Sequence, residues 1–351
     1  MTETWPWASH FVAHGLYFAT ATCGLPPRVT SGAMDTVLAD WRRGRVEAPE
    51  FDAVIAQARE RYARLVGVDA STVAIGHQVS PLVGLVADSV PDGARVLTAA
   101  GEFTSVTFPF AAQEHRGVSI TEVPLEKLAA SIDASTDLVA VSAVQSADGA
   151  IADLDAIAAA ADRHGAKVLV DLTQAAGWLP VQAGRFAYTV CGTYKWLLSP
   201  RGTAFLTVRE DVMDSLVPSQ AGWYAGEKPW ESIYGLPLRL AKDARRFDVS
   251  PAWFLWVGTN ASLGFLERVG TEELHRHALE VEAAFATAAD LRPGTSAIRS
   301  LEADELVPAL MGGVDAVASV RAGRLRMSFH VNNTVAEAEH LGRLLRGYLR
   351  D

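Results

Sequence analysis

Short apolar runs alternate with segments of helical periodicity between about residues 54 and 208. This alternation is typical of a parallel sheet whose two faces are covered by helices. The best-defined helix between the runs is Leu154–His164. The runs predict strands at Thr72–Ile75, Arg95–Thr98, Ser119–Val123, Leu138–Ala143, Lys167–Asp171, Tyr188–Cys191 and Ala204–Val208. The pattern therefore indicates an α/β fold with a mainly parallel, seven-stranded sheet.

The pattern changes after about residue 250, where short strands lie between two helical segments. We expect a long helix over Ala261–Phe285 and a last helix that begins at Val335. This arrangement predicts a large α/β domain over residues 21–249 and a smaller α+β C-terminal domain over residues 250–351.

Composition narrows the class of protein. With 351 residues, 49% hydrophobic and 21% charged, the chain can bury a large core. Its net charge of −10 is spread along the chain, which argues against nucleic-acid binding. It has no apolar run long enough for a membrane span and no leader, so we expect a cytoplasmic protein. Two cysteines without a CxxC pair, and no HExxH spacing, predict no disulfide framework and no metal site.

The most specific chemistry lies in the block VLVDLTQAAGWLPVQAGRFAYTVCGTYKWLLSPRG. Asp171 ends a buried strand, where open α/β sheets gather their ligands, and Lys195 follows within the same block. A lysine amine can form a Schiff base with a carbonyl cofactor, and a carboxylate can keep a pyridine nitrogen protonated. Gln174 is within reach of a ring hydroxyl. Taken alone, a lysine such as Lys195 is more often a surface residue and an aspartate such as Asp171 a helix cap. Together, the two residues predict a pyridoxal 5'-phosphate (PLP) site.

A phosphate site is predicted where Ser80 precedes Pro81, because serine suits a helix N-cap and proline the first turn. Such a helix directs free backbone amides, including those of Gln78 and Val79, toward an anion.

The block from Asp171 to Gly202 resembles the class V aminotransferases, the fold type I group that contains cysteine desulfurases, kynureninases and hercynylcysteine sulfoxide lyases. Five weaker matches extend the resemblance along the chain: LYFATATCGLP, GHQVS, EFTSV, RRFDVSPAW and LRMSFHVNNT. The resemblance implies the fold type I architecture and PLP as cofactor. It also implies that residues 1–20 pack on the small domain and that a homodimer shares its active sites.

The resemblance implies further cofactor contacts. Phe103 stands where kynureninases stack an aromatic ring on the cofactor, and Thr193 and Tyr194 stand beside the phosphate. Trp223 and Ser250 lie in segments that reach the phosphate in relatives, Ser250 from the partner subunit. Alternatively, the aromatic residues of segment 223–256 belong to the core or to a subunit interface rather than to the active site.

Substrate contacts are implied in the same way. Arg326 stands where the family binds the α-carboxylate of an amino acid substrate, a task that suits a planar guanidinium. Gln145 lies in a turn where it can contact the substrate or the ring, or simply be a loop residue.

The sequence also bears on the reaction, in which Lys195 removes the α-proton as general base. Residues 296–324 contain no cysteine, which argues against a cysteine desulfurase. The chain most resembles hercynylcysteine sulfoxide lyases, which favours carbon–sulfur β-elimination from a cysteine S-conjugate or sulfoxide. An aminotransferase, a kynureninase-type hydrolase and a PLP-fold binding protein without turnover are the alternatives.

Overall fold

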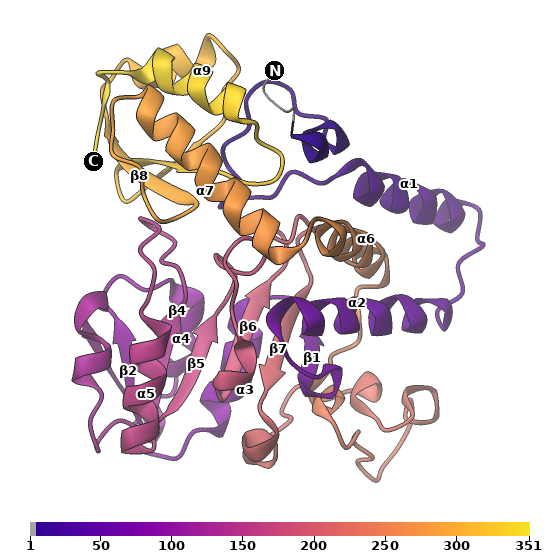
Figure 1. The fold of residues 1–351 in the computed structure, drawn as a ribbon. Coiled ribbons are helices and arrows are strands. Elements are labelled where there is room, and N and C mark those ends of the chain that lie inside the picture. The colour runs from indigo at the N-terminus through magenta and orange to yellow at the C-terminus, as the bar shows by residue number, and fades with distance from the viewer. Residues whose placement is uncertain (1–4) are drawn as a thin grey trace.

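A seven-stranded sheet forms the centre of the molecule in a computed structural model, which describes residues 5–351 (Figure 1). The strand order is β1-β7-β6-β5-β4-β2-β3, and β7 alone is antiparallel to its neighbours. The strands are β1 Val73–Gly76, β2 Arg95–Ala99, β3 Ser119–Val123, β4 Leu138–Ser142, β5 Lys167–Asp171, β6 Tyr188–Gly192 and β7 Ala204–Val208. The predicted fold class is confirmed, and each strand lies within two residues of its predicted position.

Alternate residues of the central strands enter different cores. In β4, Leu138 and Ala140 pack with α3 (Val79–Ser89) and α4 (Thr104–Ala111). Val139 and Val141 pack on the opposite face with α2 (Glu50–Val66) and α5 (Leu154–His164). Because both faces are covered, these strands read as nearly continuous apolar runs rather than as an alternation of apolar and polar residues.

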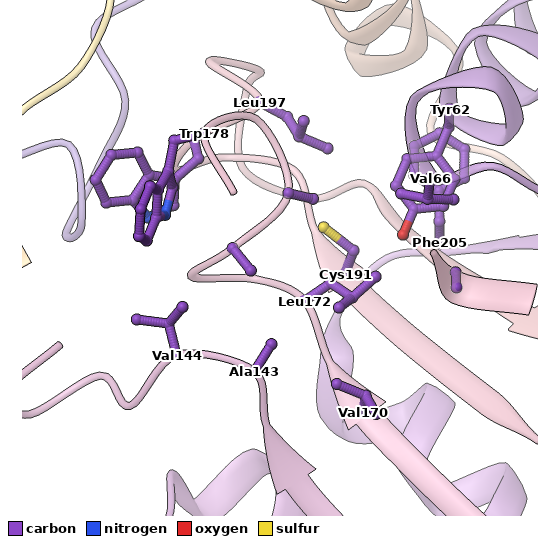
Figure 2. Close-up of a cluster of buried hydrophobic side chains, with 14 of the residues drawn as sticks. Tyr62, Val66, Ala143, Val144, Val170, Leu172, Trp178, Cys191, Leu197 and Phe205 are labelled. Carbon is purple, nitrogen blue, oxygen red and sulfur yellow. The ribbon is translucent and has the colours of Figure 1, made fainter. Parts of the chain in front are cut away.

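The core that contains Val139 and Val141 extends into the loops that follow β5 and β6 (Figure 2). Trp178, Leu172 and Cys191 are all fully buried there. Burial raises the pKa of the Cys191 thiol far above its usual range, so this cysteine is inert at neutral pH.

A smaller antiparallel sheet has the order β11-β8-β10-β9. Its strands are β8 Ile298–Ala303, β9 Ser319–Arg321, β10 Arg324–Ser328 and β11 Leu349–Arg350, and a short helix, α8 (Val307–Gly312), lies between β8 and β9. A third apolar cluster joins this sheet to α7 (Thr271–Ala288) and α9 (Val335–Leu345). The C-terminus and the first described residues of the chain, drawn in indigo, lie at this end of the molecule (Figure 1).

The predicted helix Ala261–Phe285 is wrong as a single element. The structure has two helices, α6 (Trp253–Val269) and α7, joined at Gly270. Gly270 adopts a φ of +88°, which the Cβ of other residues disfavours, so the helix ends there although the apolar pattern continues.

The N-terminal segment contacts the region around the small sheet. Phe18 N–H donates to Val317 O (2.8 Å), and Trp5 stacks on His277 with ring centroids 3.6 Å apart. Residues 1–4 of the predicted segment 1–20 lie outside the described residues. The division into domains 1–20, 21–249 and 250–351 stays a proposal. Helix α6, which this division assigns to the small domain, packs on α2 and α1 (Arg28–Arg42) of the large one. No helix within residues 5–351 has the length and apolar character of a membrane span.

A buried ion pair fastens β1 to the segment that precedes α6. Arg59 donates to Asp248 through both terminal nitrogens, at 2.6 and 3.2 Å, and Ile75 N–H donates to the same carboxylate at 2.8 Å. Asp248 is completely buried. This pair therefore holds the end of β1, and with it the start of α3, at a fixed position.

We predict that Asp248→Ala lowers the free energy of unfolding by about 3–5 kcal/mol, because Arg59 would stay buried without a partner. Urea denaturation monitored by circular dichroism measures the loss. The matched control is Glu280→Ala, which removes the exposed Arg276–Glu280 pair and should cost less than about 1 kcal/mol. Equal losses in the two variants would contradict the role given to the buried pair.

Candidate active site

The candidate active site is a pocket at the carboxyl ends of β4, β5 and β6, which end at Ser142, Asp171 and Gly192. This is the edge where parallel sheets bind ligands. The pocket brings together seven residues predicted from the sequence: Gln78, Val79, Phe103, Asp171, Gln174, Tyr194 and Lys195.

Lys195 places a buried amine in this pocket. The residue is 6% exposed, and within residues 5–351 no carboxylate lies within 4.0 Å of its amine. Its Nζ lies 5.4 Å from the ring centroid of Phe103 and 5.7 Å from that of Tyr194. Burial lowers the pKa of Lys195 to about 8, although the charge of Asp171 opposes the shift. A useful fraction of the amine is therefore neutral, and nucleophilic, near neutral pH.

Asp171 places a buried carboxylate in the same pocket. It is 4% exposed and accepts a hydrogen bond from Thr173 N–H at 2.8 Å. Burial raises the pKa of Asp171 to about 6, partly offset by the hydrogen bonding of Thr173 and the charge of Lys195. The carboxylate is ionised above that pH and suits a cationic N–H donor.

Glu102 is a functional candidate that the sequence did not reveal. Its buried carboxylate accepts hydrogen bonds from Phe103 N–H (2.7 Å), from the Ser142 hydroxyl (2.5 Å) and N–H (2.8 Å), and from Gln145 Nε2 (2.9 Å). It therefore fixes the backbone from which the Phe103 ring projects into the pocket. The only signal was its place in the EFTSV segment.

Gln145 does not reach this pocket. Its amide is bound to Glu102, and it borders a neighbouring cavity instead. In the structure the Gln145 amide holds Glu102, and a contact of Gln145 with substrate or ring stays a prediction.

The start of α3 forms one end of the pocket. The N-cap is Gln78 and the helix begins at Val79, so the predicted N-cap at Ser80 is wrong by two residues. No side chain caps the helix, so the first amides are available to an anion. Arg201 also lines this pocket, with its guanidinium 5.2 Å from the Tyr194 ring centroid. Sequence reasoning missed Arg201, whose signal was a basic residue in the loop SPRG.

Three predicted cofactor residues lie outside the pocket of a single chain. Thr193 directs its hydroxyl to Thr203, at 2.6 Å from the hydroxyl and 3.0 Å from the carbonyl oxygen, and Thr203 lines the pocket in its place. Trp223 packs against Trp230, with ring centroids 5.0 Å apart. Ser250 is exposed. That Trp223 and Ser250 contact the phosphate, Ser250 across a dimer, stays a prediction.

Gln174 and Arg326 meet at Ser146, which lines the pocket. Gln174 Nε2 donates to Ser146 Oγ at 3.0 Å, and its Oε1 accepts from Trp196 at 2.8 Å. Arg326 is 1% exposed and donates to both the carbonyl oxygen and the hydroxyl of Ser146. The guanidinium therefore lies directly behind the pocket wall.

Most of the chain is similar in sequence to a known protein family and to curated relatives. The family model described as aminotransferase class-V matches residues 16–318. The chain is 29% identical over 330 residues to the uncharacterized aminotransferase YcbU of Bacillus subtilis (strain 168), covering 86% of this chain and 84% of that one. It is 30% identical over 249 residues to the isopenicillin N epimerase of Streptomyces clavuligerus, covering 63% of this chain and 61% of that one.

Solved structures share the fold. The cystine C-S lyase C-DES, in complex with its reaction product cysteine persulfide, has a TM-score of 0.85 at 22% identity and covers 96% of this chain and 98% of its own. The apo cysteine desulfurase of Thermococcus onnurineus NA1 has a TM-score of 0.81 at 20% identity, with 94% of each chain covered.

We predict that acylation of Lys195 by an amine-reactive reagent in cofactor-free protein, measured by peptide mass spectrometry, rises with pH and reaches half its maximum near pH 8. Asp171→Asn should move this midpoint to lower pH, because the carboxylate stabilises the ammonium form. Surface lysines in the same digest provide the control. A midpoint that stays unchanged in Asp171→Asn would show that the two groups do not interact.

Proposed function

The chain belongs to the aminotransferase class-V family, and from that premise we propose that it is a PLP-dependent carbon–sulfur lyase. Its substrate is a cysteine S-conjugate or sulfoxide, from which it removes the sulfur substituent by β-elimination. The observation that carries the proposal is the juxtaposition of Lys195 and Asp171, an amine and a carboxylate buried in one pocket with their pKa values moved toward neutrality.

The residues present fit PLP. Lys195 offers the amine that bonds the aldehyde, and Asp171 offers the carboxylate that holds the pyridine N–H. Phe103 presents an aromatic face to the ring, while the first amides of α3 and the Arg201 guanidinium suit the phosphate. When bound, PLP supplies an electron sink that stabilises negative charge on the substrate's α-carbon.

The chain's own residues then carry the proton and hold the substrate. With a pKa of about 8, the Lys195 amine can take the α-proton near neutral pH and return it. Arg326 holds the α-carboxylate. Because Lys195 and Asp171 are almost completely buried, water has little access to the atoms that exchange the proton.

The positions of the two cysteines favour β-elimination over sulfur transfer, which needs a reactive cysteine on a loop. Residues 296–324 contain none, Cys191 is buried with its pKa raised by burial, and the exposed Cys23 lies in the segment LYFATATCGLP rather than on the loop before β10. The resemblance to C-DES, a cystine C-S lyase, supports the same choice. In the reaction, the α-proton is removed, the C–S bond breaks with its electron pair on sulfur, and the three-carbon remainder takes up water to give pyruvate and ammonia. Within this reaction class we propose the hercynylcysteine sulfoxide lyases as the most similar enzymes. We also propose that the enzyme is a homodimer with shared active sites.

An aminotransferase is the second candidate, because the relative YcbU carries that description. Products separate the two. Incubation with cysteine S-conjugates, their sulfoxides, kynurenine and ordinary amino acids should release pyruvate and ammonia from the sulfur compounds catalytically. A keto acid formed once per active site without ammonia, and turned over only with a second keto acid, would overturn the lyase in favour of the aminotransferase.

We predict that borohydride reduction of the wild-type protein with PLP fixes the cofactor on the peptide that contains Lys195, as measured by mass spectrometry. Lys195→Ala should lose this adduct and all turnover, because the pocket offers no other amine. Lys167→Ala, which removes a lysine from the far end of β5, serves as control and should keep both. An undiminished adduct in Lys195→Ala would refute the assignment.

A further inference from the structure

Two arginines of one hairpin converge on a single hydroxyl beside the pocket. Arg326 Nη2 donates to Thr22 Oγ1 at 2.8 Å, and Arg321 Nη2 donates to the same oxygen at 3.5 Å. The hairpin consists of β9 and β10, joined by a tight turn in which Ala322 and Gly323 have φ of +48° and +76°. The turn therefore sets the distance between the two guanidinium groups.

No carboxylate of the described chain balances this pair. Throughout residues 5–351, neither Arg321 nor Arg326 has a carboxylate within 4.0 Å. Arg324 of the same hairpin, by contrast, pairs with Glu302 at 3.1 Å. Acidic residues outnumber basic ones in this chain by 41 to 31, so unpaired neighbouring arginines are not a result of scarce carboxylates. Two like charges placed together raise each other's energy and attract an anion.

The two guanidinium groups differ in what they can still bind. Arg326 is buried and uses four of its five N–H groups on Ser146, Thr22 and Ser319. Arg321 is exposed and bonds only to the carbonyl of its neighbour Val320 and, at the longer distance, to Thr22. Arg321 therefore retains free donors, while Arg326 has room for one more contact.

Arg321 is linked to the pocket through Thr22, which Arg326 also binds. Its charge helps to lower the pKa of Lys195, after burial and the charge of Arg326. Burial first, and then the charge of Arg321, lower the pKa of Arg326 to about 10, so the Arg326 guanidinium stays charged at neutral pH. Both cations therefore lie on one side of the pocket, next to Ser146 and Thr22.

We infer that Arg321 binds a second anionic group, carried on the substrate's side chain, so that the substrate is an amino acid with two acidic groups. The inference rests on the proposed function, in which Arg326 holds the α-carboxylate. It adds that the group attached to sulfur is acidic. A carboxylate, sulfonate or phosphonate on the departing side chain has the required charge and acceptor oxygens.

Matched ligands that differ only in charge test the inference. S-carboxymethyl-cysteine and S-carbamoylmethyl-cysteine form one pair, and glutamate and glutamine form another. The change in absorption of the PLP-loaded protein on titration gives the dissociation constant of each ligand, independently of turnover. Wild-type protein should bind the acidic member of each pair about tenfold more tightly, since one charge-assisted contact distinguishes the two.

Arg321→Gln should abolish this preference while leaving the affinity for the neutral ligands unchanged. Arg324→Gln is the matched control: it removes the same charge from the same hairpin, but its partner is Glu302, so the preference should persist. Added salt should weaken the preference in wild-type protein, because Arg321 is exposed.

Each other outcome has a definite meaning. Equal affinity of wild-type protein for both members of each pair would overturn the inference, as would an equal loss for both in Arg321→Gln. If no amino acid changes the absorption, the proposed function itself fails. If the neutral ligands bind and the acidic ligands bind no more tightly, the proposed function stands and only the role of Arg321 is rejected.

Discussion

The site depends on the burial of an amine and a carboxylate in one pocket without direct contact between them. Burial penalises the charged form of each group, and the attraction between Lys195 and Asp171 offsets only part of that penalty. Had they formed a close ion pair, the amine would be held as an ammonium and lost as a nucleophile. Their separation leaves each group free for a ligand, and the surrounding structure maintains it.

Three sets of contacts maintain this arrangement, and each draws on a different part of the chain. Glu102 ties the loop after β2 to the end of β4. The hydroxyls of Thr193, Thr203 and Thr259 form a buried chain that joins the turn before Lys195 to β7 and α6. The Arg59–Asp248 pair holds β1 at the anion end. The pocket is therefore a property of the whole sheet edge rather than of one motif.

The sheet and the central pair could be predicted because they follow from local pattern. Buried strands are continuous apolar runs, and Asp171 stands where such a run stops. The failures concern features that local pattern does not encode. The apolar periodicity continues through Gly270, so only its backbone geometry reveals that the helix ends there. Side-chain direction is equally hidden, so the sequence could not show that the side chains of Gln145 and Thr193 are bonded to Glu102 and Thr203.

The contacts of Thr22 and Trp5 have a consequence for the order in which the molecule matures. The cofactor end of the pocket, from Gln78 to Thr203, lies within a continuous stretch that leaves the ribosome early. The substrate side instead joins Thr22 to Arg326, and Trp5 of the N-terminal segment likewise bonds to Val331; each pair is more than 300 positions apart. Contacts this remote in sequence form late, since the C-terminal strands must first be synthesised. The substrate side of the pocket is therefore the part that is completed last.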